Sequence, residues 1–212
     1  MSTYDLEEQE QLAALKAWWQ QYGNLIVTAI TLVLVGFAAW NAWHWYQQSQ
    51  ATQAASLYEN LQKAARLNDA KSVRDSAGAI LEQYPRTAYA PLAALVAAKV
   101  NFQAGDLKTA KAQLQWVVEK AKTDELKAVA RLRLAGVLLD EGGSEDALKA
   151  LDGKPATGFE SLFGSLRGDI FVTQKKPAEA RAAYQAALEK ADKRDRSIRE
   201  QIQLKLDALG SG

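Results

Sequence analysis

The chain has 212 residues, with no cysteine, one histidine, and 26 basic against 25 acidic side chains. The lack of cysteine excludes disulfides, thiolate zinc sites and a cysteine nucleophile, and a single histidine excludes a multi-histidine metal site. Because the basic and acidic residues are interleaved, the charge pattern indicates a mixed solvated surface and argues against nucleic acid as a partner.

The first predicted element is a single membrane-spanning helix over residues 25–46, preceded by a short acidic tail, residues 1–24. Between Lys16 and Glu59 the chain contains no Asp, Glu, Lys or Arg. As a helix the apolar run reaches roughly 33 Å, enough for a hydrocarbon core of about 30 Å. A buried helix of a soluble protein and a cleaved signal peptide both fit less well, because the run is apolar on all faces and its leader is acidic.

Aromatic side chains flank this run on both sides. Trp and Tyr prefer membrane interfaces, because each combines an apolar ring with a polar edge. The predicted interface anchors, in contact with membrane lipid, are Trp18, Trp19, Tyr22, Trp40, Trp43, Trp45 and Tyr46. The only histidine, His44, lies in this cluster; we interpret it as an interfacial polar group, with a proton- or lipid-responsive role as the alternative.

The charged residues near the span say little about which of its ends is cytoplasmic. The positive-inside rule counts Lys and Arg near the ends of a span, and here Lys16 stands against nothing before Lys63. This single lysine favours a cytoplasmic N-terminus and a large domain on the other side of the membrane.

Residues 47–212 are predicted to form one all-α domain. They are rich in Ala, Leu, Gln and Lys, and breaks recur about every fifteen to twenty residues. The predicted helices are 47–67, 69–83, 87–104, 107–121, 124–141, 144–151, 157–174, 177–191 and 195–209. Pro85 and Pro177 cannot lie in a helix interior, and Gly105 and Gly142 supply left-handed caps.

The helices form pairs, and a repeat underlies the pairing. Its clearest copy, residues 166–191, has small residues at Gly168 and Ala180 and an aromatic ring at Tyr184, at the spacing of the tetratricopeptide motif. The equivalent small residues of the four copies are Val73, Ala110, Ala147 and Ala180, about 33 to 37 residues apart. We therefore predict a tetratricopeptide-like α-solenoid of about four helical hairpins, closed by the capping helix 195–209. The alternative is a helical bundle without repeats.

Stacked hairpins present a groove lined by the first helix of each pair, and such grooves typically bind an extended peptide or a helix of another protein. The predicted groove residues are Leu95, Lys99 and Phe102 in the second hairpin, Leu132 and Leu139 in the third, and Asp169 and Val172 in the fourth. For Leu132 and Leu139, core packing is the alternative.

Signals of catalysis are weak in this sequence. No glycine-rich phosphate loop is present, and adjacent acids such as Asp140 and Glu141 diverge by about 100° on a helix. We therefore predict a binding protein and not an enzyme, with no catalytic residues, no cofactor and no metal ion. Two carboxylates that meet from distant helices would be the exception.

Five segments together resemble the YfgM family, the ancillary subunits of the bacterial SecYEG translocon. They are LKAWWQQYGN, WNAWHWYQQSQ, TAYAPLAALVAAK, a segment that contains DELKAVARLRLA, and GFESLFGSLRGDIFVTQKKPAEARAAYQAALEKA, in this order over nearly the whole chain. The resemblance implies a bacterial inner-membrane protein with a cytoplasmic N-terminus and a periplasmic tetratricopeptide domain.

The resemblance also implies partners. They are the SecYEG translocon, a periplasmic chaperone of the PpiD type, and exported or unfolded polypeptides. The family supplies no catalytic residues. The alternative function is a structural scaffold of an envelope complex that binds no client proteins.

Overall fold

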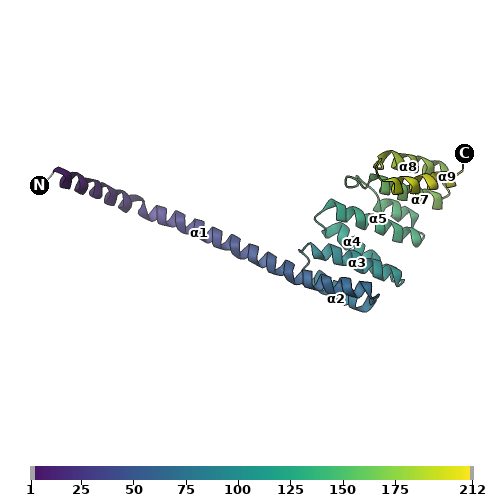
Figure 1. The fold of residues 1–212 in the computed structure, drawn as a ribbon, viewed down its shortest axis with the longest axis horizontal. Helices are drawn as coiled ribbons and strands as arrows, with labels where there is room; N and C mark the ends of the chain where they lie inside the picture. The colour runs from purple at the N-terminus through teal and green to yellow at the C-terminus, as the bar shows by residue number, and fades with distance from the viewer. Residues whose placement is uncertain (1–2, 211–212) are drawn as a thin grey trace. The chain divides into compact units, whose positions relative to one another are not determined.

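The computed structural model describes residues 3–210, with side chains from Glu10 onward. Over these residues the fold is all-α, as the sequence predicts (Figure 1). The helices are α1 (Thr3–Arg66), α2 (Ala70–Gln83), α3 (Tyr89–Gln103), α4 (Leu107–Lys120), α5 (Asp124–Asp140), α6 (Ser144–Ala150), α7 (Glu160–Thr173), α8 (Pro177–Lys190) and α9 (Arg196–Ala208). The chain divides into two units, of which the first ends at Gln50 and the second begins at Ala51.

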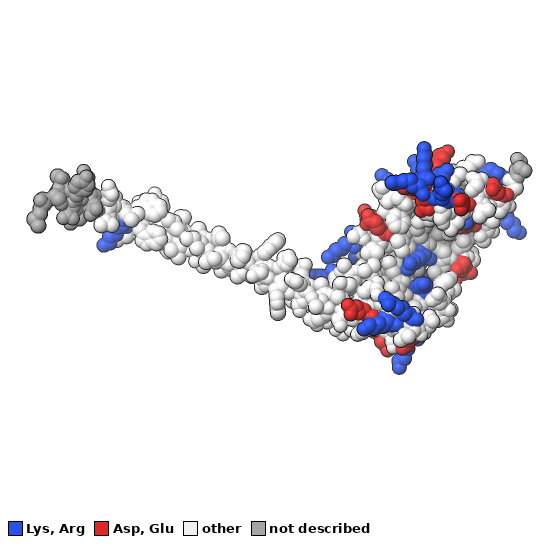
Figure 2. All heavy atoms as spheres, in the orientation of Figure 1, with Lys and Arg blue, Asp and Glu red and all other residues white. Residues whose placement is uncertain are grey.

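The first unit is helical and apolar on its outside. Its described residues include an 18-residue window with a mean hydropathy of 2.0 in which no residue is buried. Figure 2 shows this stretch of α1 without blue or red atoms. By length and composition α1 is able to cross a membrane. All seven predicted interface anchors are exposed, from 43% at Tyr22 to 73% at Trp45.

Two hydroxyl groups inside the apolar stretch are satisfied by the helix itself. Thr28 donates to the carbonyl of Asn24 at 2.7 Å, and Thr31 donates to the carbonyl of Val27 at 2.8 Å. Because lipid offers no hydrogen-bond partner, these local bonds remove the cost of placing a hydroxyl in the hydrocarbon layer.

The second unit is a row of helical hairpins. Consecutive helices from α2 to α9 contact each other. Two further pairs, α3 with α5 and α5 with α7, are also in contact. The equivalent small residues of the four repeats, Val73, Ala110, Ala147 and Ala180, are all fully buried. The contacting helices belong to the same hairpin or to neighbouring hairpins, which is the arrangement expected of a solenoid.

The backbone repeats with the sequence. The four hairpins are α1 with α2, α3 with α4, α5 with α6, and α7 with α8. In the turn of each hairpin one residue has a left-handed conformation, with φ of 55° at Asn68, 79° at Gly105, 81° at Gly142 and 57° at Lys175. Three helices, α2, α4 and α9, begin at an N-cap aspartate whose carboxylate accepts a backbone N–H at 3.0 to 3.1 Å. These local signals explain why the predicted boundaries of α2 to α9 agree with the structure to within a few residues. The predicted boundary between the span 25–46 and the helix 47–67 is absent, because both lie in the continuous helix α1.

Helices α7 and α8 approach each other closely. A Cβ atom added at Gly168 would lie 2.3 Å from the ring of Tyr184, and one added at Gly164 would lie 2.9 Å from the Cβ of Ala187. Only glycine allows this approach, so the small residue and the aromatic ring of the repeat motif have the roles that the sequence predicts.

Candidate protein-binding site

A hollow of about 440 Å³ lies between α3 and α5, the first helices of two neighbouring hairpins. Two of the predicted groove residues, Lys99 and Phe102, line it, and Phe102 is 39% exposed. The full lining is Ala98, Lys99, Phe102, Gln103, Leu114, Arg133, Gly136, Val137 and Asp140. A hollow of this size suits a side chain or a short peptide segment better than a whole folded partner.

Helical spacing brings these side chains to one place. Lys99 and Phe102 are three residues apart on α3, and Arg133, Gly136 and Asp140 follow one another along a single face of α5. The guanidinium of Arg133 also donates to the backbone carbonyl of Leu95 at 3.2 Å, which ties α5 to α3. The lining therefore combines an apolar floor with two cations and one carboxylate.

The other predicted groove residues are divided between core and surface. Leu95 is 6% exposed and belongs to a core cluster with Leu114 and Val117, so the prediction that it lines the groove is not compatible with its burial. Leu132 and Leu139 are partly buried and pack against the cluster around Phe163, which agrees with their core alternative. Val172 is 44% exposed on α7.

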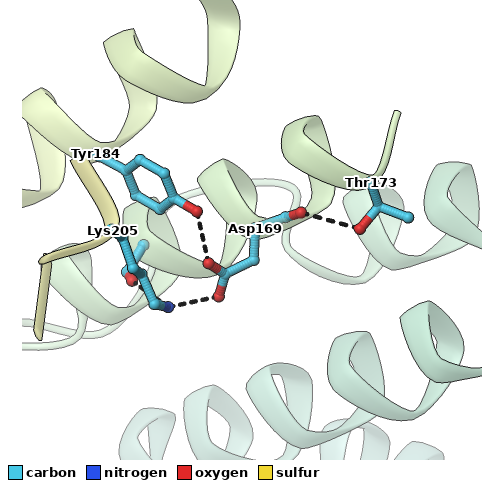
Figure 3. Close-up of polar contacts among 5 residues, drawn as sticks. Asp169, Thr173, Tyr184 and Lys205 are labelled. Atoms are coloured by element: carbon cyan, nitrogen blue, oxygen red, sulfur yellow. Dashed lines mark hydrogen bonds and ion pairs between the residues drawn. The ribbon is translucent and has the colours of Figure 1, made fainter. Parts of the chain in front are cut away.

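Asp169 lies in a polar network at the C-terminal end of the domain (Figure 3). Its carboxylate accepts a hydrogen bond from Tyr184 of α8 at 2.7 Å and pairs with Lys205 of α9 at 2.6 Å. The ammonium of Lys205 also donates to the hydroxyl of Ser165 at 3.1 Å. These bonds join α7, α8 and α9, so the carboxylate predicted to contact a ligand is engaged within the fold.

The network changes the acidity of Tyr184. Burial of the phenol raises its pKa first, and the hydrogen bond to Asp169 and the charge of that carboxylate raise the pKa further. A group with a higher pKa in the folded state adds stability that is present below its unfolded pKa and lost as the pH rises through its folded pKa.

We therefore expect the domain to lose stability in alkaline solution partly through Tyr184. Above about pH 10, where an unfolded tyrosine ionises, the melting temperature of the wild type should fall more steeply than that of Tyr184→Phe. Circular dichroism melts of both proteins between about pH 9 and about pH 11 measure this difference. The lysines, which also ionise in this range, are the same in both proteins, so their effect on the melting temperature cancels in the comparison. Equal slopes for the two proteins would contradict the prediction.

Seven lining residues were not predicted as groove residues: Ala98, Gln103, Leu114, Arg133, Gly136, Val137 and Asp140. Gly136 and Asp140 follow Leu132 by one and two helical turns, so an extension of that face along α5 would have found them. Arg133 carries no such signal, because its role depends on the carbonyl of Leu95 on another helix.

A second hollow, of about 630 Å³, lies beside the N-terminal end of α5. It is lined by Val118, Asp124, Glu125, Lys127, Ala128, Arg131, Lys154, Pro155, Ala156 and Thr157. Asp124 and Lys127 pair with each other at 3.6 Å, and Arg131 stacks over Phe163 and donates to the carbonyl of Ala150. Several of its charged groups thus have partners within the domain, so the hollow between α3 and α5 is the stronger binding candidate. Among residues 10–210, no group of three His, Asp or Glu side chains could hold a metal ion.

Known proteins resemble this chain over almost its whole length. The family described as Tetratricopeptide repeat-like domain matches residues 16–211. A Neisseria gonorrhoeae protein named Ancillary SecYEG translocon subunit is 31% identical over 205 residues, which are 96% of this chain and 98% of that protein. Proteins of the same name are 29% identical over 210 residues in Aggregatibacter actinomycetemcomitans, covering 97% of this chain and 99% of the relative, and 27% over 209 residues in Escherichia coli, covering 99% of each.

The family match confirms the predicted repeat, and the alternative of a helical bundle without repeats is wrong. The similarity includes the apolar helix as well as the hairpins, because it begins before residue 25 and extends to the end of α9. The chain therefore belongs to the YfgM family, whose members are tetratricopeptide-like proteins named as ancillary SecYEG translocon subunits.

Proposed function

We propose that this protein is an ancillary subunit of the SecYEG translocon, anchored in the bacterial inner membrane by α1. The observation that carries the proposal is the similarity over nearly the full length to relatives that bear this name. The exposed apolar stretch of α1 supports the membrane anchor, since a surface of this kind is stable in lipid and unfavourable in water.

The finer part of the proposal concerns topology and partners. The N-terminus is cytoplasmic, the hairpin domain is periplasmic, and the domain links the translocon to a PpiD-type chaperone and assists exported polypeptides. A domain tethered to the membrane meets chains that emerge nearby at high effective concentration, so weak contacts are sufficient for capture. The hollow between α3 and α5 supplies a surface for such contacts, with Phe102 as its exposed aromatic ring.

The test is site-specific photo-crosslinking in cells, with the reactive side chain placed at Phe102. We expect crosslinks to translocon subunits, to a periplasmic chaperone, and to a population of nascent exported chains that changes with the proteins being secreted. The control is the same side chain at Leu204 of α9, which is 69% exposed and far along the chain from the hollow. Leu204 should capture few nascent chains.

A constant set of crosslinked partners without nascent chains would favour a structural scaffold that binds no clients. The topology has its own control, a compartment-sensitive reporter fused after Gly212, which should be active on the periplasmic side. A reporter active in the cytoplasm would overturn the proposed topology.

A further inference from the structure

Gly136 is a glycine that the fold does not require. It lies within α5, its φ is not in the left-handed region, and a Cβ atom added to it would meet no atom within 4 Å. Glycine inside a helix is less favourable than alanine, because the unfolded chain loses more freedom when it folds. Gly168 shows the opposite case, since its missing Cβ makes room for Tyr184.

What Gly136 provides is open space in the hollow. It lines the hollow together with Phe102, whose ring is 39% exposed, and with the apolar side chains of Ala98, Leu114 and Val137. An apolar group that entered this space would contact the bare backbone of α5 on one side. Burial of a large apolar side chain is the interaction that such a site favours.

Charges at the edge of the hollow add a preference. Two cations, Lys99 and Arg133, face one carboxylate, Asp140, and Arg133 is held in place by its bond to the carbonyl of Leu95. An acidic group on a ligand would therefore be attracted on balance, and a basic group repelled.

We propose that the hollow between α3 and α5 binds one large apolar side chain of an extended polypeptide and prefers acidic residues beside it. The apolar side chain lies against Phe102 and the backbone of Gly136, and the acidic neighbour lies near Lys99 and Arg133. The inference rests on the proposed function, which makes the ligand a polypeptide. It adds the kind of segment that this site prefers, an apolar residue with acidic neighbours.

The test measures binding of fluorescent peptides to the full-length protein in detergent. Three short peptides share a Gly-Ser background and differ at the centre: Phe with Asp neighbours, Phe with Lys neighbours, and Ser with Asp neighbours. We expect the first to bind about fivefold more tightly than the second and about tenfold more tightly than the third. Lys99→Glu should remove or reverse the preference for Asp over Lys.

Two substitutions at Gly136 separate binding from folding. Gly136→Leu fills the hollow and should weaken binding of the Phe peptide by about tenfold or more. Gly136→Ala should raise the melting temperature by about 2 °C and still weaken binding, a combination that damage to the fold cannot produce. The matched control is Gly78→Ala in α2, where an added Cβ also meets no atom within 4 Å. It should raise the melting temperature equally and leave binding unchanged.

Equal binding by the wild type and Gly136→Leu would overturn the inference, as would the lack of any difference among the three peptides. Co-purification of SecYEG with each variant is measured in parallel. If SecYEG co-purifies but no peptide binds, the inference is wrong and the proposed subunit role stands. If the peptides bind as expected but SecYEG does not co-purify, the proposed subunit role is wrong and the peptide site stands.

Discussion

Replacing Phe163 with alanine is expected to lower the free energy of unfolding of the hairpin domain by about 3–5 kcal/mol. Phe163 is 1% exposed and is among the largest fully buried side chains of the described residues. It packs in a cluster that joins α5, α6 and α7. The guanidinium of Arg131 lies 5.1 Å from the centre of its ring, so the substitution removes a cation–π contact as well as apolar packing.

Urea unfolding followed by circular dichroism measures this loss. The control is Phe102→Ala, because Phe102 is 39% exposed and lines the hollow instead of a core. The control should cost clearly less stability, since a side chain that is partly in water before the substitution loses less burial. Similar losses for the two variants would contradict the placement of Phe163 at the junction of the third and fourth hairpins.

The second large effect is expected for Gly168→Ala. The added methyl group would have to displace the ring of Tyr184, which lies 2.3 Å from the position of the new Cβ. Overpacking of a filled core costs about 1–3 kcal/mol, and here the hydrogen bond from Tyr184 to Asp169 would be disturbed as well. The measurement is again the free energy of unfolding in urea.

Alanine is normally the better helix former, so the sign of this effect is informative. Gly78→Ala adds the same methyl group at a helix position with no atom within 4 Å and should stabilise the domain slightly. A stabilising Gly168→Ala would show that α7 and α8 do not approach each other as closely as the structure has them.

Most of the fold could be predicted because its signals are local. Pro177 is the first residue of α8, and Asp69 and Asp106 cap α2 and α4 through bonds to residues three positions ahead. Gly105 and Gly142 have the left-handed conformation that ends a helix. None of these features depends on a distant part of the chain, so the sequence alone specifies them.

The candidate site was predicted only in part. The spacing within the repeat selected Lys99 and Phe102, which line the hollow, and also Leu95, which is buried. All three lie on neighbouring turns of α3. The spacing does not determine which of these positions is covered by another helix, because that depends on the angle and distance between neighbouring hairpins.

The sequence by itself determined the apolar helix, the all-α class, the hairpin boundaries and the repeat, because each depends on the residues of one segment. Only the tertiary structure decided which surfaces are available. It placed Arg133 against the carbonyl of Leu95, left open space at Gly136, and joined Asp169 to Lys205 across α7 and α9. The two contacts join residues that are tens of positions apart in the sequence, and the open space depends on how neighbouring hairpins pack. Helical periodicity carries no information about either.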